Sequence, residues 1–322
     1  MHLRTYVGHL VLLIMLLSAA SCREDIYEFR PYEPVAEDMH SLFEQIVEPR
    51  NTVAFHFEGK GNPLPDTILS LPGGARLHLD NAEELFENEN GVPVPCSSCA
   101  DLRIEATLAG RKSDWVARQL PQLSFPDGYV LESVGILHLQ VRCAAQRLRL
   151  RSGRSLRIQL PISAPLANAK LFVFSAHTDT EGRVLGWIPN SGALPYIVHS
   201  SHVDFELFVN QLGWLNCARV LSDSLTSVCV NLPQQFTALN TRIFLFFQHA
   251  NALVELSGNT TDSNFCSSKV PLGHVVHAVV VAKTGKQYWM AQTSVEITAN
   301  MRLSLVPKPV SQQDIVALLR KF

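Results

Sequence analysis

The sequence predicts an all-β protein of two antiparallel β-sandwich-like domains, with a short N-terminal helix and a short C-terminal helix. Three observations support this fold class. Short apolar segments that alternate with polar residues recur along the 322 residues, 17 Gly and 18 Pro punctuate them, and strand-favouring Val, Ile and Thr are frequent. The hydrophobic fraction of 47% and the net charge of -2 argue against a disordered chain and against a general nucleic-acid-binding protein.

Residues 1–21 are predicted to be a lipoprotein signal peptide. Arg4 supplies a positive charge, residues 10–17 are all apolar, and small residues lead up to Cys22. The apolar run is shorter than the roughly 20 residues with which a helix crosses a bilayer. Small residues directly before a cysteine resemble a bacterial lipobox, and this resemblance implies that Cys22 becomes an acylated, palmitate-bearing anchor. An ordinary cleaved signal peptide with a coincidental cysteine is the alternative.

Residues 22–50 are predicted to form an acidic tether that leads into a short helix. Six acidic residues and only two arginines lie between Cys22 and His40, and such a stretch buries little apolar surface. Acids just after a lipidated cysteine resemble the surface-export signal of Bacteroidota lipoproteins. This implies an outer-membrane lipoprotein exposed at the cell surface, with a periplasm-facing anchor as the alternative. A helical spacing of apolar residues predicts the helix: Val35, Met39, Leu42, Phe43 and Ile46.

Residues 51–165 are predicted to form the first β-sandwich domain, and residues 166–310 the second. In both, short strand-like segments are separated by turn residues, and Pro161 and Pro165 mark the expected boundary. Two segments of the second domain, residues 243–247 and 279–282, are continuously apolar, which predicts strands buried on both faces.

Residues 311–322 are predicted to form the C-terminal helix. Ser311 followed by Asp314 resembles a capping box, in which the two side chains bond the backbone N–H groups at the start of a helix. Ile315, Leu318 and Leu319 provide one apolar edge, which is typical of a short helix that packs on a β domain.

Several short motifs resemble those of an uncharacterised group of Bacteroidota envelope lipoproteins. They are Leu131-Glu132-Ser133-Val134-Gly135, Leu148-Arg149-Leu150, Ile158-Gln159-Leu160-Pro161, Gly186-Trp187-Ile188 and Leu212-Gly213-Trp214-Leu215-Asn216-Cys217. Val134 replaces a glycine of the group's pattern, and Ala218 replaces an aspartate. The first domain is also similar to the β-sandwich modules that accompany ankyrin-type scaffolding proteins, through Gly73-Gly74 and the strands that follow. The resemblance implies an all-β extracytoplasmic protein and no particular reaction.

Seven cysteines leave an even set of six once Cys22 is assigned to lipid. These six are disulfide candidates in an oxidising compartment: Cys96, Cys99, Cys143, Cys217, Cys229 and Cys266. We expect one bridge within the first domain that involves Cys143, and a second that joins Cys217 to Cys229 or Cys266. The C-x-x-C pair at 96 and 99 follows two prolines and precedes a strand pattern, which favours a structural bridge or turn over a redox site.

An arginine-rich segment is the one concentrated electrostatic feature of the sequence. Six arginines occur in it without an acid: Arg142, Arg147, Arg149, Arg151, Arg154 and Arg157. Arg147, Arg149 and Arg151 alternate with leucines, so a strand places all three on one face. That face is a candidate for binding an anionic glycan or a partner's carboxylates, and a solvated strand face is the alternative.

Aromatic and histidine residues provide further candidates. Trp187, Trp214, Tyr288 and Trp289 are possible sugar-stacking residues, and among them Trp289 is the best candidate for an exposed ring. His274 and His277 lie in a Val-rich strand pattern, where residues three apart point to opposite faces and do not chelate one metal. His199 and His202, with Asp204 beside them, are weaker candidates for a metal site.

No G-x-S-x-G, H-E-x-x-H, P-loop or G-x-G-x-x-G motif occurs. We therefore expect a non-enzymatic, lipid-anchored envelope protein that presents its β domains to an envelope protein or an anionic glycan. No cofactor, metal or nucleic acid is expected. A carbohydrate-binding surface lipoprotein and a cryptic metal-dependent hydrolase are the alternatives.

Overall fold

The computed structural model describes residues 36–47, 51–59, 61–161, 166, 169–189, 198–201, 204–221 and 224–322. The predicted signal peptide, Cys22, most of the acidic tether, Pro165 and His202 lie outside the described residues. Ala36–Phe322 form one compact unit of the chain.

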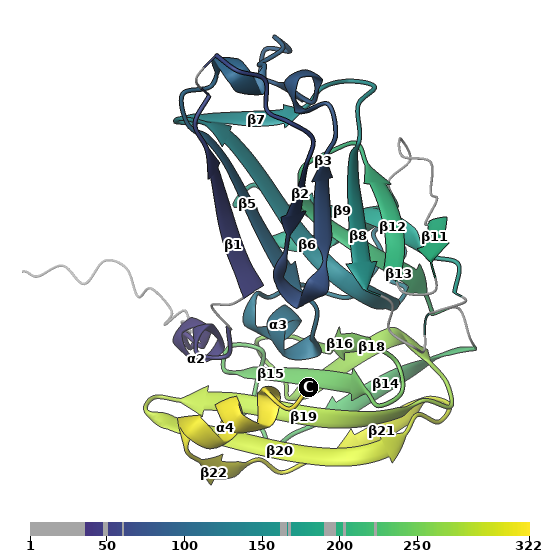
Figure 1. Cartoon of the computed structure of the whole chain (residues 1–322). Coiled ribbons are helices and arrows are strands. Elements are labelled where there is room, and N and C mark those ends of the chain that lie inside the picture. The colour runs from purple at the N-terminus through teal and green to yellow at the C-terminus, as the bar shows by residue number, and fades with distance from the viewer. Residues whose placement is uncertain are drawn as a thin grey trace, which may run out of the picture. The chain divides into compact units, whose positions relative to one another are not determined.

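Most of the described chain is strand, and the all-β sandwich-like fold predicted from the sequence is confirmed (Figure 1). The first strands and helices are α2 (His40–Glu44), β1 (Thr52–Phe57), β2 (Thr67–Ser70), β3 (Arg76–Leu79), β4 (Phe86–Glu87), β5 (Leu102–Ala109), α3 (Lys112–Ala117), β6 (Leu131–Cys143), β7 (Gln146–Leu150), β8 (Leu156–Pro161), β9 (Phe172–Thr178), β10 (Val184–Pro189), β11 (Val198–Ser201), β12 (Asp204–Val209) and β13 (Gly213–Val220). The remaining ones are β14 (Leu225–Asn231), β15 (Thr241–Phe247), β16 (Leu253–Glu255), β17 (Ser257–Gly258), β18 (Asn264–Pro271), β19 (Val275–Thr284), β20 (Gln287–Glu296), β21 (Met301–Ser304), β22 (Lys308–Val310) and α4 (Gln312–Leu319).

Two pairs of sheets make up the fold. In the first pair, the large sheet has the order β1-β5-β6-β13-β9-β10, with β7 added to β6, and it packs on the sheet β11-β12-β8-β3-β2. In the second pair, the sheet β17-β18-β14-β21 packs on the sheet β16-β15-β19-β20-β22. The paired strands are antiparallel, except that β14 and β21 run parallel.

The strand pairing shows that the chain passes from the first pair of sheets to the second after Val220. Strands β9 and β13 follow the prolines at which the sequence suggested a boundary, yet β13 pairs with β6 and β9 pairs with β13 in the large sheet. Pro161 is the last residue of β8, so this proline ends a strand inside the first sandwich.

Three apolar cores hold the unit together. The first lies between the two sheets of the first pair, and the third lies between the two sheets of the second pair. The middle core joins the large sheet to β15 and β19 and includes residues of α2, α3 and α4. Ile243, Leu245 and Phe247 of β15 enter the third core, whereas Phe244 and Phe246 enter the middle one. The prediction that these apolar segments are buried on both faces is therefore confirmed.

Both predicted helices are present, and a third was missed. The Ser311 hydroxyl accepts a hydrogen bond from the Asp314 backbone N–H at 3.2 Å, as the capping box predicts for α4. Phe43 and Leu42 of α2 are buried in the middle core. The six-residue α3 had no recognised pattern in the sequence. Within the described part of the chain, no helix is long and apolar enough to cross a membrane.

Candidate functional site

Two disulfides cross-link the strands of the fold, and one of the two predicted pairings is correct. Cys143, at the end of β6, bonds Cys99 within the first sandwich, as expected. Cys229 and Cys266 lie directly opposite each other on β14 and β18, with 4.2 Å between their Cα atoms, and form the second bridge. The predicted pairing of Cys217 with either of them is wrong, because β13 places Cys217 in the first core, away from both.

The C-x-x-C segment forms a 3₁₀ turn, Cys96–Ser98, before β5. Cys99 is in the disulfide, and the buried Cys96 thiol donates to the Ala82 carbonyl at 3.2 Å. Burial, together with the nearby Glu83 carboxylate, raises the pKa of Cys96 to about 12. A reactive thiolate requires a lowered pKa, so the turn interpretation fits this segment better than a redox one.

The Leu-Glu-Ser-Val-Gly motif lies where the two pairs of sheets meet. The Glu132 carboxylate is buried on β6 and accepts from Arg219 Nε at 2.7 Å. The Ser133 hydroxyl donates to Gln122 Oε1 at 2.6 Å, and its backbone N–H donates to the Asn251 carbonyl at 3.0 Å. Asn251 belongs to the turn between β15 and β16, so this motif joins the large sheet to the second pair of sheets.

Three of the six arginines in the arginine-rich segment pair with acids that are distant in the sequence: Arg149, Arg154 and Arg157. On β7 the leucines face the core, whereas Arg147 and Arg149 are exposed. Arg149 Nε donates to Glu87 Oε1 on β4 at 2.8 Å. Arg154 pairs with Glu84, and Arg157 pairs with Asp80 and Glu206. Of the three arginines proposed as an anion-binding face, Arg149 is therefore already engaged.

The strand register instead brings together basic residues from four neighbouring strands. On the large sheet, His56 of β1 lies opposite Arg103 of β5, Arg103 lies opposite Arg142 of β6, and Arg142 lies opposite Arg147 of β7. All four side chains are exposed on one face. We call this set the basic row. Of its members, Arg142 and Arg147 belong to the arginine-rich segment of the sequence, whereas Arg103 and His56 are recognised only from the strand pairing.

Among the described residues, acidic side chains lie within ion-pair distance of only two members of the basic row. His56 lies 3.4 Å from Asp101, and Arg103 lies 3.3 Å from Glu105. Arg142 contacts the neutral side-chain amide of Gln140. For Arg147, the described residues provide no acid within ion-pair distance. Arg147 and Arg149 also line a groove of about 620 Å³ together with Glu87, Glu89 and Gln211.

The exposed face of β6 continues from the basic row to a histidine–tryptophan pair. The His138 ring lies 4.7 Å from the Trp214 ring of the Gly-Trp-Leu-Asn-Cys motif. Burial, with a further contribution from Arg147 and a smaller one from Arg118, lowers the pKa of His138. Trp214 therefore lies beside a neutral imidazole, close to the positive end of the sheet face.

The other aromatic candidates are packed into the protein. Trp289 is half-buried against Phe236 with 5.7 Å between ring centroids, and its indole N–H is enclosed with no hydrogen-bond partner among the residues that the structure describes. Trp187 is fully buried. The indole ring of Trp289, which we predicted to stack on a glycan, therefore packs against the third core.

The histidine candidates are separated from one another. The His274 ring packs on Phe247 and the His277 ring packs near Phe322, so the two histidines face different cores, as expected for a strand. Asp204 forms an ion pair with Arg76. The side chain of His199 lies outside the described residues. Among the described residues, no three His, Cys, Asp or Glu side chains converge in a metal-ligating group.

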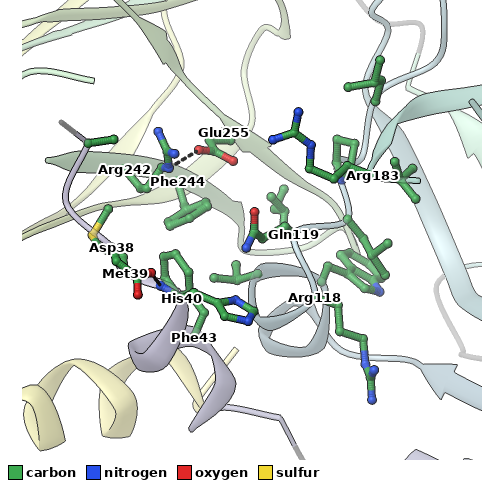
Figure 2. A pocket seen from close by; sticks show the side chains of 18 of the residues that line it. Asp38, Met39, His40, Phe43, Arg118, Gln119, Arg183, Arg242, Phe244 and Glu255 are labelled. Carbon is green, nitrogen blue, oxygen red and sulfur yellow. Dashed lines mark hydrogen bonds and ion pairs between the residues drawn. The ribbon is translucent and has the colours of Figure 1, made fainter. Parts of the chain in front are cut away.

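A large pocket lies where α2, α3, the turn between β9 and β10, and strands β15 and β16 meet (Figure 2). Its volume is about 750 Å³, within the range of small-molecule sites. We call it the junction pocket. Its charged and polar walls include Arg118, Gln119, Arg183, Arg242 and Glu255. The sequence does not reveal this pocket, because six segments spread over more than 200 residues form it and none carries a local motif.

No family model, no curated protein and no solved structure matches this chain.

Proposed function

We propose that this protein is a non-enzymatic lipoprotein of the outer membrane, anchored through Cys22, that binds an anionic glycan with the exposed face of its first sandwich. The basic row is the observation that carries the binding function. An envelope protein with a carboxylate-rich surface is the second partner class, and it would use the same face.

Like charges placed directly opposite each other destabilise a sheet. The basic row contains two such pairings of arginines in succession, from β5 to β7. Neighbouring strands are about 4.8 Å apart, so the four side chains cover about 14 Å. A bound polyanion relieves their mutual repulsion, and the planar guanidinium group of arginine donates two parallel hydrogen bonds to a carboxylate or a sulfate.

Two observations support an exported, anchored protein. The small residues before Cys22 resemble a lipobox, and the apolar run of residues 10–17 that precedes them is too short to serve as a spanning helix. Two disulfides stabilise the β domains, and disulfides persist mainly in oxidising compartments such as the periplasm and the cell surface.

The glycan-binding proposal is tested with the purified full-length protein in detergent, with polygalacturonate as the probe and neutral dextran as the reference. The double change Arg142→Ser with Arg147→Ser is expected to weaken polygalacturonate binding at least tenfold at low salt. Added salt should weaken binding by the wild-type protein, because exposed charges are screened. Arg154→Ser is the matched control, since Arg154 is exposed but paired with Glu84.

Equal binding by the double variant and the wild-type protein would exclude the basic row as the glycan site. Equal loss in the Arg154→Ser control would show that total charge, and not the row, determines binding.

The anchor is tested separately in cells. Cys22→Ala is expected to abolish labelling with a palmitate analogue and to move the protein from the membrane fraction to the soluble fraction, since the acyl chains provide the membrane affinity. Protease added to intact cells should cleave the wild-type protein if its domains face outward. A Cys22→Ala protein that stays with the membranes would refute lipid anchoring.

A further inference from the structure

The groove beside the basic row opens where the large sheet divides. Strand β13 pairs with residues 131–139 of β6, and β7 pairs with residues 141–143. Because β5 pairs with residues 136–143 along the other edge of β6, β13 and β7 lie on the same side of that strand. The groove, of about 620 Å³, lies between β7 and residues 210–212, which lead into β13. Its volume is in the range of small-molecule sites.

Two opposite charges without ion-pair partners line this groove. On β4 and β7, Glu87 lies opposite Arg149. Two residues further along this antiparallel register, Glu89 comes across from Arg147, and both side chains are exposed and line the groove. Among the described residues, neither Arg147 nor Glu89 lies within ion-pair distance of an opposite charge. The groove lining therefore holds a guanidinium and a carboxylate that do not contact each other.

An ordered turn carries Glu89. The Asn88 side-chain carbonyl accepts from the backbone N–H groups of Asn90 and Val92, each at 3.0 Å, and the Asn88 N–H donates to the Val92 carbonyl at 2.9 Å. None of these bonds involves the Glu89 side chain. The turn therefore holds the carboxylate at the groove and leaves its oxygens available to a ligand.

The other two charged side chains described above neutralise each other. Arg149 pairs with Glu87 at 2.8 Å, so Arg147 and Glu89 determine which ligand the groove accepts. Arg147 attracts an anion, but the Glu89 carboxylate repels an anion that brings only negative charge. The two residues together select an anion that also carries hydrogen-bond donors, because an ionised carboxylate is purely an acceptor.

We propose that this groove binds one uronic acid residue of the anionic glycan, with the sugar carboxylate on Arg147 and two adjacent sugar hydroxyls donating to Glu89. The inference rests on the proposed glycan-binding function and names the sugar class that the site recognises. In a hexuronate, the carboxylate and the O2 and O3 hydroxyls lie on opposite sides of the pyranose ring, so one residue reaches both charges. The Arg147 guanidinium donates two parallel hydrogen bonds to the carboxylate, and the carboxylate of a neighbouring sugar pairs with Arg142.

This assignment separates the two partner classes, because a carboxylate-rich protein surface brings no adjacent sugar hydroxyls to Glu89. The test compares three probes with six carboxylates each: hexagalacturonate, hexagalacturonate acetylated at O2 and O3, and end-capped hexaglutamate. Binding to the full-length protein in detergent is measured by isothermal titration calorimetry at low salt. The wild-type protein is expected to bind hexagalacturonate most tightly, because this probe alone carries the hydroxyl donors.

Glu89→Ala should weaken hexagalacturonate binding about fivefold, because hydrogen bonds to a charged group are lost. The same change should leave the other two probes bound as tightly as before or more tightly, because it removes a repelling charge. Arg147→Ser should weaken the binding of all three probes. Glu296→Ala is the matched control, since it removes the same charge from an exposed strand residue outside the groove, and it should bind hexagalacturonate as the wild-type protein does.

The outcomes distinguish this inference from the function on which it rests. Equal affinity of the wild-type protein for hexagalacturonate and its acetylated form would overturn the uronate site. A Glu89→Ala protein that binds hexagalacturonate as tightly as the wild-type protein, or more tightly, would overturn it too. In both cases the basic row remains an anion-binding face if the Arg142→Ser, Arg147→Ser double variant loses binding. If the wild-type protein binds none of the three probes, the glycan-binding function fails, and the uronate site fails with it.

Discussion

Single residues explain why the Leu-Glu-Ser-Val-Gly motif has a structural role. The Glu132 side chain is only 2% exposed, yet it carries a carboxylate, and Arg219 Nε and Nη2 both lie within 2.7 Å of the same oxygen. These residues are cross-strand partners on β6 and β13. A buried carboxylate with one arginine partner is stable only while that partner is present.

Arg219→Leu is therefore expected to lower the free energy of unfolding by about 3–5 kcal/mol, because it leaves the buried Glu132 carboxylate without the arginine that hydrogen-bonds to it. The double change Glu132→Leu with Arg219→Leu should recover most of this loss, since it removes both charges. Urea denaturation measures both. Arg183→Leu is the control and should change the free energy of unfolding little, because Arg183 pairs with acids at an exposed turn. A double variant as unstable as the single one would contradict the explanation.

At the scale of elements, the start of α3 and the turn after β15 form the joint between the two pairs of sheets. Lys112 Nζ, at the start of α3, donates to the Phe247 carbonyl at the end of β15. The Asn251 amide donates to the Ser133 carbonyl at 2.8 Å and to the Gly110 carbonyl at 3.3 Å. Burial lowers the pKa of Lys112 to about 8, although the nearby Glu132 opposes this shift.

This joint predicts a pH dependence of stability. An unfolded lysine keeps its proton up to about pH 10.4, whereas Lys112 in the folded protein loses it near pH 8. The unfolded state therefore binds more protons over this interval, and the contribution of Lys112 to stability rises with pH, by about 1–3 kcal/mol. Lys112→Met should lack this contribution. The measurement is the difference in unfolding free energy between wild type and Lys112→Met at pH 7 and pH 9.5; equal differences at both values would refute the prediction.

The sequence predicts those elements that depend on neighbouring residues, but not the contacts between distant strands. The α4 capping box and the doubly buried β15 were predictable, because each depends on residues within a few positions of one another. The pairing of Arg149 with Glu87 spans 62 residues and depends on β4 lying beside β7. Cys217 likewise remains a thiol outside any disulfide because β13 places it in the first core, and the sequence does not show which core β13 enters. The junction pocket could not be predicted at all, because each segment contributes only a few of its lining residues and no segment carries a recognisable motif.

At the scale of the whole molecule, the middle core makes the two pairs of sheets interdependent. Ile136 and Phe174 of the large sheet, Trp115 of α3, and Phe244 and Val279 of the second pair belong to this one apolar cluster. Neither pair of sheets covers these side chains by itself. Separating the pairs would expose the apolar face of β15 and β19 to water, at about 25 cal/mol for each Å² of apolar surface.

We therefore expect residues 36–322 to unfold in a single cooperative transition, although they contain two sandwiches. Hydrogen exchange followed by mass spectrometry in increasing urea is the measurement, with β5 reporting on the first pair of sheets and β19 on the second. Leu160→Ala removes a side chain that is buried only in the first core and should destabilise the protein by about 2–5 kcal/mol. If the middle core couples the two pairs, this change shifts the opening of β5 and β19 to lower urea by the same amount. Opening of β5 alone, with β19 unshifted, would show that the sandwiches unfold independently and that the middle core is a weak interface.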